Sequence, residues 1–153
     1  VLVALYWFAK KRKTTFFVVS DLVAPLVPFG LAFGRLGNFI NGELWGRPTD
    51  LPWALQLSDG ATYHPTFLYE ALCNFALAAV LIKLTGRYPK GSLFALYVAI
   101  YSLGRGVIET LRIDESNLIM GLRLNLWTSL ILLVSASFIA FKLNRKNASK
   151  VAT

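Results

Sequence analysis

The residues best suited to chemistry lie in one short polar stretch, at positions 34–47, beside segments apolar enough to span a membrane. The stretch contains two arginines, two asparagines, one glutamate and four glycines. A polar group in hydrocarbon must be satisfied within the protein, because leaving it unpaired costs several kcal/mol. Ionisable groups at membrane depth therefore indicate a functional site by default. The alternative is a glycine-rich loop at the membrane surface whose charges are simply solvated.

The side chains of this stretch suit recognition of a phospholipid. Arg35 and Asn38 are one helical turn apart, and Asn41 and Glu43 lie just beyond them. The arginine suits a phosphodiester, the asparagine suits a glycerol hydroxyl or an ester carbonyl, and Glu43 suits positioning or proton transfer. Three neighbouring glycines are expected to permit sharp turns and close packing: Gly34, Gly37 and Gly42.

A second charged group consists of Arg105, Glu109 and Arg112, at spacing i, i+4 and i+7. On a helix these three side chains share one face. One carboxylate between two guanidiniums leaves a positive site with spare donors, which could hold a lipid phosphate while Glu109 fixes the orientation of the arginines. The alternative is a structural ion-pair ladder that ties two helices together.

Two further ionisable residues, His64 and Glu70, lie at the start of the next apolar segment. His64 could act as a general base near neutral pH, although a lone histidine at a membrane interface is more often only a hydrogen-bonded cap. Glu70 is expected one turn inside the membrane, where a carboxylate needs a partner. One of the arginines is the obvious candidate for that partner.

The composition indicates an integral membrane protein. Of 153 residues, 56% are hydrophobic and 16% are charged, against about 25% charged in a soluble domain. The net charge of +8 could suggest a nucleic-acid ligand, but all eight lysines fall in three clusters, at positions 10–13, 83–90 and 142–150. This is the pattern of cytoplasmic loops under the positive-inside rule and argues against nucleic acid. The basic residues outside these clusters are all arginines: Arg35, Arg47, Arg105, Arg112 and Arg123.

Four apolar stretches predict transmembrane helices, at positions 16–33, 67–82, 93–103 with an extension to 109, and 124–141. Pro25 and Pro28 predict a kink or break in the first of them. Residues 1–9 are too short to span a bilayer and are expected to be the end of a further helix.

The predicted fold class is therefore all-α: a polytopic helical integral membrane protein with about four full transmembrane helices plus the end of a fifth. Residues 1–153 are expected to form a single transmembrane domain, in which residues 143–153 are a basic, disordered cytoplasmic tail. With the lysine clusters in the cytoplasm, the polar stretch at 34–47 faces the outer leaflet.

The sequence predicts neither a metal site nor a cofactor. His64 is the only histidine, and no cysteine or carboxylate cluster has the spacing of metal ligands. Cys73 is the only cysteine and is expected to be a buried small residue.

Three motifs together resemble one enzyme family. GRLGNFINGELWG at 34–46 resembles the signature of the bacterial prolipoprotein diacylglyceryl transferases, and HPTFLYE at 64–70 and RGVIETLR at 105–112 resemble the downstream motifs of that family, in the same order. The resemblance implies an inner-membrane, multi-pass transferase with its active site toward the outer leaflet. It also implies the reaction: the diacylglyceryl group of phosphatidylglycerol passes to the thiol of the lipobox cysteine of a prolipoprotein, forming a thioether and releasing glycerol phosphate.

The resemblance also implies roles for individual residues. The catalytic residues would be Arg105, Glu109, Glu43 and Asn38. The residues that bind substrate would be Arg35, Asn41, Gly46, Arg112, His64 and Glu70. The partners would be phosphatidylglycerol, the lipobox cysteine and membrane lipids.

The family also carries a histidine-glycine-glycine motif on the helix before the first basic loop, upstream of the first residue of this sequence. We therefore expect either a fragment of a longer protein or a truncated, inactive copy. Two rival functions remain: a non-catalytic phospholipid-binding membrane subunit, and a subunit of an anion transporter whose arginines line an ion path. A transporter would be expected to show an internal repeat, and the sequence contains none that we can recognise.

Overall fold

The computed structural model describes residues 2–113 and 118–151, and the described part is almost entirely helical. The helices are α1 (Leu2–Lys11), α2 (Phe16–Val23), α3 (Leu26–Asn41), α4 (Thr66–Leu84), α5 (Ser92–Glu109) and α6 (Leu124–Val151). Two short hairpins lie in the connections, β1 (Leu55–Gln56) with β2 (Thr62–Tyr63), and β3 (Leu118–Ile119) with β4 (Leu122–Arg123). The all-α prediction is confirmed, and the hairpins are additions that the hydropathy pattern did not predict.

Four segments are long and apolar enough to cross a membrane: Phe16–Asn41, Thr66–Leu84, Ser92–Glu109 and Leu124–Leu143. The four predicted spans are thus confirmed, and α1 is the short helix expected before them. The first span is longer than predicted, because α3 continues beyond Phe33 to Asn41. This places Arg35, Asn38 and Asn41 on a helix rather than in a glycine-rich loop.

Proline divides the first span as predicted. Helix α2 ends at Val23 and α3 begins at Leu26, with Pro25 at the start of α3 and Pro28 in its first turn. A proline lacks the N–H that would continue the helical ladder but is tolerated in the first turn, where that N–H has no intrahelical partner. The break therefore separates two helices and leaves α3 regular up to its polar end.

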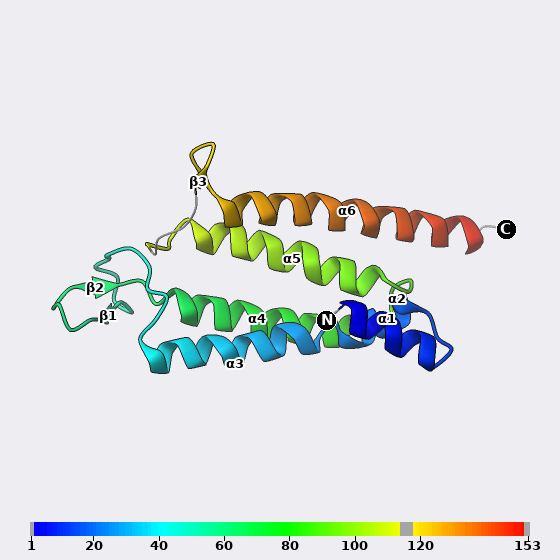
Figure 1. The fold of residues 1–153 in the computed structure, drawn as a ribbon, viewed down its shortest axis with the longest axis horizontal. Coiled ribbons are helices and arrows are strands. Elements are labelled where there is room, and N and C mark those ends of the chain that lie inside the picture. Colours follow the sequence, from blue (N-terminus) through cyan, green and yellow to red (C-terminus); the bar gives the residue numbers. More distant parts are fainter. Residues whose placement is uncertain (1, 114–117, 152–153) are drawn as a thin grey trace.

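The long helices lie side by side, with α3 on α4, α4 on α5 and α5 on α6 (Figure 1). Five buried residues form a small apolar core between α2, α4 and α5: Ala24, Leu77, Leu81, Leu93 and Tyr97. Many large apolar side chains instead point outward, such as Leu72 (66% exposed) and Ile82 (60% exposed) on α4. Such a surface suits lipid, which is as apolar as these side chains are.

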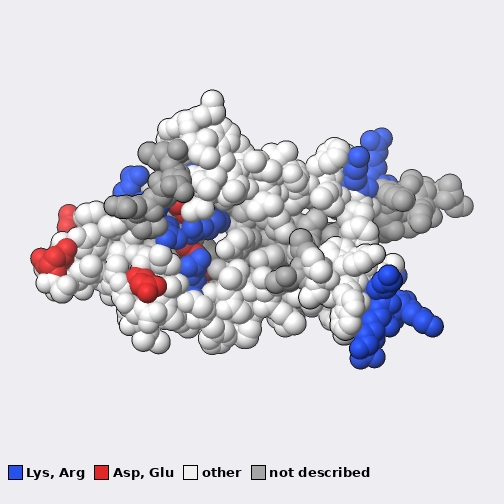
Figure 2. Space-filling model, in the orientation of Figure 1, with Lys and Arg blue, Asp and Glu red and all other residues white. Residues whose placement is uncertain are grey.

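Charge is divided between the two ends of the molecule. Figure 2 shows basic side chains at the end where α1 meets α2, and acidic side chains at the opposite end. Further basic side chains lie nearer the acidic end, beside carboxylates. The connections at the basic end carry residues 10–13 and 85–91, and those at the acidic end carry residues 42–65 and 110–123.

The C-terminal tail differs from the prediction. Helix α6 runs from Leu124 to Val151, so the backbone of most of residues 143–153 is helical rather than disordered. The helix ladder continues from the apolar span, and lysine and arginine have good helix propensity.

A carboxylate from α2 caps α5 at the basic end of the molecule. Asp21 accepts hydrogen bonds from the backbone N–H of Gly91 at 2.6 Å and of Phe94 at 2.9 Å. The first N–H groups of a helix have no intrahelical partner and favour a negative charge. Gly91 adopts the left-handed conformation, at φ +92°, which suits glycine.

We expect Asp21→Ala to lower the free energy of unfolding by about 2 kcal/mol, because two N–H groups lose a charged acceptor. Asp21→Asn keeps one acceptor oxygen and is the matched control, with an expected loss of about half as much. Thermal unfolding in detergent micelles measures both changes. A Tm for Asp21→Ala equal to that of the unsubstituted chain would show that this cap contributes no stability.

Candidate functional site

Six charged side chains from α3, α4, α5 and the connection between α5 and α6 meet near the acidic end of the helices. We call them the arginine–glutamate cluster: Arg35, Glu70, Arg105, Glu109, Arg112 and Arg123. Their formal charges sum to 4 − 2 = +2. Four of the five arginines that lie outside the lysine clusters of the sequence belong to this group.

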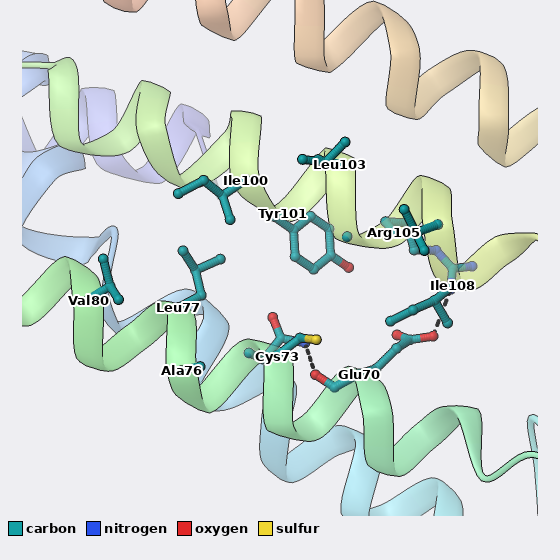
Figure 3. Close-up of a pocket in the computed structure, with 13 residues that line it drawn as sticks. Glu70, Cys73, Ala76, Leu77, Val80, Ile100, Tyr101, Leu103, Arg105 and Ile108 are labelled. Carbon is teal, nitrogen blue, oxygen red and sulfur yellow. Dashed lines mark hydrogen bonds and ion pairs between the residues drawn. The ribbon is translucent and has the colours of Figure 1, made fainter. Parts of the chain in front are cut away.

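Glu70 is the centre of the arginine–glutamate cluster. Its side chain is 4% exposed, and its two carboxylate oxygens lie 2.6 Å from Arg35 Nε and 2.9 Å from Arg105 Nη1. Arg112 Nη1 lies 3.9 Å away. A buried carboxylate is costly unless it is paired and hydrogen-bonded, so these contacts explain how Glu70 remains inside the helix bundle. An arginine partner for Glu70 was predicted, and the structure shows that three arginines approach it (Figure 3 draws the pair with Arg105).

Glu109 is the second centre and is fully buried. Its oxygens lie 2.7 Å from Arg105 Nη2 and 2.8 Å from Arg123 Nε, and Asn125 Nδ2 donates a hydrogen bond at 3.0 Å. Arg105 therefore bridges Glu70 and Glu109, with one guanidinium nitrogen on each. The spacing i, i+4 predicted the contact between Arg105 and Glu109. It could not identify Arg123, which is 14 residues from Glu109 in the sequence.

Arg112 reaches the cluster by a different route from the one predicted. Helix α5 ends at Glu109, so Arg112 is not on the same helical face as Arg105, and that prediction was wrong. Its backbone pairs with Gly46 in an isolated β-bridge, and its carbonyl accepts a hydrogen bond from Arg123 Nη1 at 2.7 Å. The side chain is buried, at 8% exposed. The turn after α5, held to residue 46, thus replaces the predicted helical face.

A chain of hydrogen bonds leads from the cluster toward the surface. Arg35 Nη1 donates to Asn38 Oδ1 at 3.2 Å, and Asn38 Nδ2 donates to Glu43 Oε2 at 3.2 Å. Glu43 is exposed, as is Asn41 at the end of α3. The side chain of Arg35 is 20% exposed. Arg35 therefore connects the buried carboxylate of Glu70 with polar groups that face solvent or a lipid headgroup.

The glycines near this site do not all act as predicted. Gly34 and Gly37 lie within α3 in ordinary helical conformation and make no turn, so for these two the prediction was wrong. Of the three glycines, Gly42, the C-cap of α3, is the one with a positive φ, of +68°, a conformation that carries no penalty for glycine. Its turn redirects the chain so that Glu43 folds back on Asn38.

His64 is not part of the arginine–glutamate cluster, and its side-chain partner is Tyr69. Its Nδ1 is 3.1 Å from the Tyr69 hydroxyl, which also accepts a hydrogen bond from Trp53 Nε1 at 2.8 Å. The backbone carbonyl of His64 accepts a hydrogen bond from the N–H of Gly46 at 2.9 Å. These contacts agree with the interpretation of His64 as a hydrogen-bonded residue at the start of α4.

Gly46 is buried where two connections cross. A Cβ atom at this position would lie 2.7 Å from His64 Cβ and 2.7 Å from Thr66 Cγ2. Both neighbours are close to the backbone and have little freedom to move away. The absence of a side chain at Gly46 therefore allows the 34–47 stretch to approach the start of α4.

We expect Gly46→Ala to lower the free energy of unfolding by about 1–3 kcal/mol, the usual cost of overpacking. Gly34→Ala is the matched control, because a Cβ atom there has no neighbour within 4 Å. It is expected to stabilise the helix by about 0.5–1 kcal/mol. Chemical denaturation in micelles distinguishes the two variants, and equal stability would contradict close packing at Gly46.

The connection between α3 and α4 contains two groups whose pKa values are shifted, Asp59 and Tyr63. The hydroxyl of Tyr63 donates a hydrogen bond to Asp59 at 2.7 Å, which lowers the pKa of Asp59, with help from the N–H of Ala61. The same contact raises the pKa of Tyr63. Because the pKa of Asp59 is lowered on folding, this contact stabilises the β1–β2 hairpin above the ordinary pKa and is lost in acid.

Within residues 2–113 and 118–151, no three histidine, cysteine, aspartate or glutamate side chains come together where they could bind a metal ion. The charged groups of the arginine–glutamate cluster are guanidiniums and carboxylates. Such a set binds an anionic, oxygen-rich group and can offset negative charge that develops on it.

Comparison with known proteins agrees with the motifs. Relatives named phosphatidylglycerol–prolipoprotein diacylglyceryl transferase include those of Polynucleobacter asymbioticus (50% identical over 131 residues), Streptomyces griseus (48% over 124) and Corynebacterium diphtheriae (38% over 168). These alignments cover 82%, 76% and 96% of this chain, but 50%, 38% and 59% of the relatives. The chain thus spans about half the length of the curated relatives it matches.

The family model for prolipoprotein diacylglyceryl transferase matches residues 1–142. This range contains the whole arginine–glutamate cluster and all four segments long enough to span a membrane, apart from the end of the last. The chain is a multi-pass membrane protein that belongs to the prolipoprotein diacylglyceryl transferase family.

Proposed function

We propose that this chain forms the phospholipid-binding and reacting part of a phosphatidylglycerol–prolipoprotein diacylglyceryl transferase. In the proposed reaction, the thiolate of the lipobox cysteine attacks the carbon of the diacylglyceryl group that is esterified to phosphate. The new bond is a thioether, and the carbon–oxygen bond to phosphate breaks, so that glycerol phosphate leaves with the electron pair. The names of the relatives and the family match support this reaction.

The observation that carries the proposal is the convergence of Arg35 and Arg105 on one buried carboxylate, Glu70. Two guanidiniums that share one buried carboxylate are suited to a phosphodiester, whose oxygens match the planar N–H groups of arginine. Negative charge grows on the phosphate as it leaves, and preorganised positive groups offset it without reorganising.

The other residues are assigned roles from their contacts. Glu70 and Glu109 orient Arg35 and Arg105, since their oxygens bind the guanidinium nitrogens at 2.6–2.9 Å. Asn38 and Glu43 extend from Arg35 toward the exterior and suit the hydroxyls of the headgroup glycerol. The remaining proposed binding residues surround them at the same end of the molecule: Asn41, Gly46, His64 and Arg112.

The distribution of charge supports an orientation in the membrane. Basic side chains collect at one end of the helices, and the proposed site lies toward the other. Lysine and arginine are enriched in cytoplasmic loops. We therefore propose that the protein resides in the bacterial inner membrane with its site toward the outer leaflet, where phosphatidylglycerol and the prolipoprotein meet it.

The test is transfer of the diacylglyceryl group, radiolabelled in its own glycerol, from phosphatidylglycerol to a lipobox-cysteine peptide in proteoliposomes. Two proteins are compared: this chain alone, and this chain joined behind the N-terminal half of the Polynucleobacter asymbioticus relative. We expect transfer by the joined protein. Transfer by this chain as well would show that it contains every group the reaction needs. No transfer by either protein, when the intact relative is active in parallel, would contradict the proposal.

The assay also addresses the non-catalytic alternative. A phospholipid-binding subunit would bind phosphatidylglycerol but would transfer nothing, even in the joined protein. An anion transporter is not favoured, because the family match is to a transferase.

A further inference from the structure

An apolar groove of about 510 Å³ lies between α4 and α5. Its polar end is formed by Glu70 and Arg105, and its walls farther along include Leu77, Val80 and Ile100. Figure 3 shows these side chains facing one another across the gap between the two helices. The groove therefore begins at the arginine–glutamate cluster and continues into the apolar part of the bundle.

The groove is open along one side, on the surface of this chain. Val80 is 45% exposed, Ile100 is 40% exposed and Leu103, on its rim, is 56% exposed. Cys73, which the sequence predicted to be buried, is instead exposed and lines the groove. An apolar groove that is open on a membrane-spanning pair of helices is suited to the apolar tail of a lipid.

The dimensions of the groove decide what it can hold. Ten residues of α4 separate Glu70 from Val80, which is about 15 Å along a helix. A volume of about 510 Å³ over this length gives a mean cross-section of about 34 Å². A helix about 10 Å across needs about 80 Å², so the helical segment of a signal peptide does not fit. A single extended hydrocarbon chain is thin enough.

The charges at the polar end of the groove indicate the charge of the headgroup that a bound molecule would have. Arg35 and Arg105 bring two guanidiniums to the one carboxylate of Glu70, and the side chain of Arg35 is 20% exposed. An anionic group can therefore approach them, whereas a cationic group would be repelled. The groove thus matches an amphiphile with a negative head and an apolar tail.

We propose that this groove takes one acyl chain of phosphatidylglycerol. We further propose that Val80 and Ile100 determine which chain lengths are preferred, because they line the inner end of the groove, away from Glu70 and Arg105. The proposal rests on the proposed function, in which the phosphate of the same lipid lies on Arg35 and Arg105. Lipid tails leave one apolar environment for another when they enter the groove, so selection comes from van der Waals contact and steric fit. Preferences of several-fold are expected rather than complete exclusion.

The first experiment narrows the inner end of the groove by Val80→Trp. In mixed micelles with the active joined protein, we expect the ratio of kcat/KM for dipalmitoyl over dilauroyl phosphatidylglycerol to fall about three- to tenfold. Leu72→Trp is the matched control, since Leu72 is on the same helix, 66% exposed and outside the groove. It is expected to leave the ratio unchanged. An unchanged ratio in Val80→Trp, or an equal fall in both variants, would overturn the proposal.

The second experiment measures occupancy without activity. Cys73 is the only cysteine of this chain and lines the groove, so its alkylation rate by a small maleimide in micelles reports access. The protein is this chain alone. We expect dipalmitoyl phosphatidylglycerol to slow alkylation at least threefold more than dipalmitoyl phosphatidylcholine does, and Val80→Trp to remove the difference. Equal rates with the two lipids would overturn the proposal.

The two experiments separate this inference from the proposed function. Selective protection of Cys73 without transfer by any version of the protein would remove the proposed function and keep the groove as a lipid site. If transfer occurs but Val80→Trp leaves the chain-length ratio unchanged and phosphatidylglycerol does not selectively protect Cys73, the proposed function is supported and the acyl-chain site is contradicted.

Discussion

Glu70→Ala is expected to lower the free energy of unfolding by about 3–5 kcal/mol, the cost of removing one partner from a buried ion pair. The substitution leaves Arg35 and Arg105 in the bundle without the carboxylate that they share. Because folded proteins are only marginally stable, losing this much free energy of unfolding should leave little folded protein. The measurement is the yield of monodisperse protein on size exclusion, followed by thermal unfolding of what remains.

Two further variants serve as comparisons for Glu70→Ala. Glu43→Ala removes an exposed carboxylate near the same site and should change stability by less than about 0.5 kcal/mol. Glu70→Gln keeps the shape of the side chain but directs an NH₂ group at a guanidinium, so its stability should lie between the other two. If Glu70→Ala were as stable as Glu43→Ala, the three arginines around Glu70 would have to be neutralised by other groups.

Arg35→Lys is expected to reduce transfer by the joined protein about 10²-fold, the typical effect of losing one preorganised donor to a developing oxyanion. Lysine keeps the positive charge, but it is a compact point charge without the planar fork of arginine. Arg35 binds Glu70 through Nε and Asn38 through Nη1. The single side-chain nitrogen of lysine cannot reproduce these two separate contacts. The initial rate of diacylglyceryl transfer from phosphatidylglycerol measures the effect.

The matched control for Arg35→Lys is Arg47→Lys. Arg47 belongs to the same polar stretch, but it is exposed and outside the arginine–glutamate cluster, and its substitution should leave the rate within about twofold of the unsubstituted protein. Folding is checked by Tm in both variants, so that a loss of rate with an unchanged Tm is assigned to phosphate recognition. A full rate in Arg35→Lys would show that only positive charge is needed at this position.

Several features of the site follow from local sequence. The hydropathy of each span depends only on its own residues, so the four membrane-spanning segments could be predicted, although the first continues eight residues beyond its predicted end. Pro25 predicts a break within the first span, because a proline inside a helix has no N–H to continue the hydrogen-bond ladder. The contact between Arg105 and Glu109 follows from the pitch of one helix.

Other features depend on how distant segments pack. Glu70 needed a cationic partner on physical grounds, but its sequence could not indicate that Arg35 and Arg105, each 35 residues away, both reach it. Arg123 was recognised as an arginine outside the lysine clusters, yet its contact with Glu109 depends on the packing of α5 against the start of α6. Arg112 was assigned to a helical face that does not exist, because α5 ends three residues earlier.

The sequence by itself determined the membrane class, the spans, the family and the need for charge compensation at Glu70. These depend on hydrophobicity, on motif identity and on the cost of a buried charge, all of which are properties of short segments. Only the tertiary structure decided which arginines share each carboxylate, that Asp21 caps α5, and that a groove runs from the cluster between α4 and α5. Contacts between segments far apart in the chain are set by the packing of whole helices, and no local pattern of residues encodes that packing.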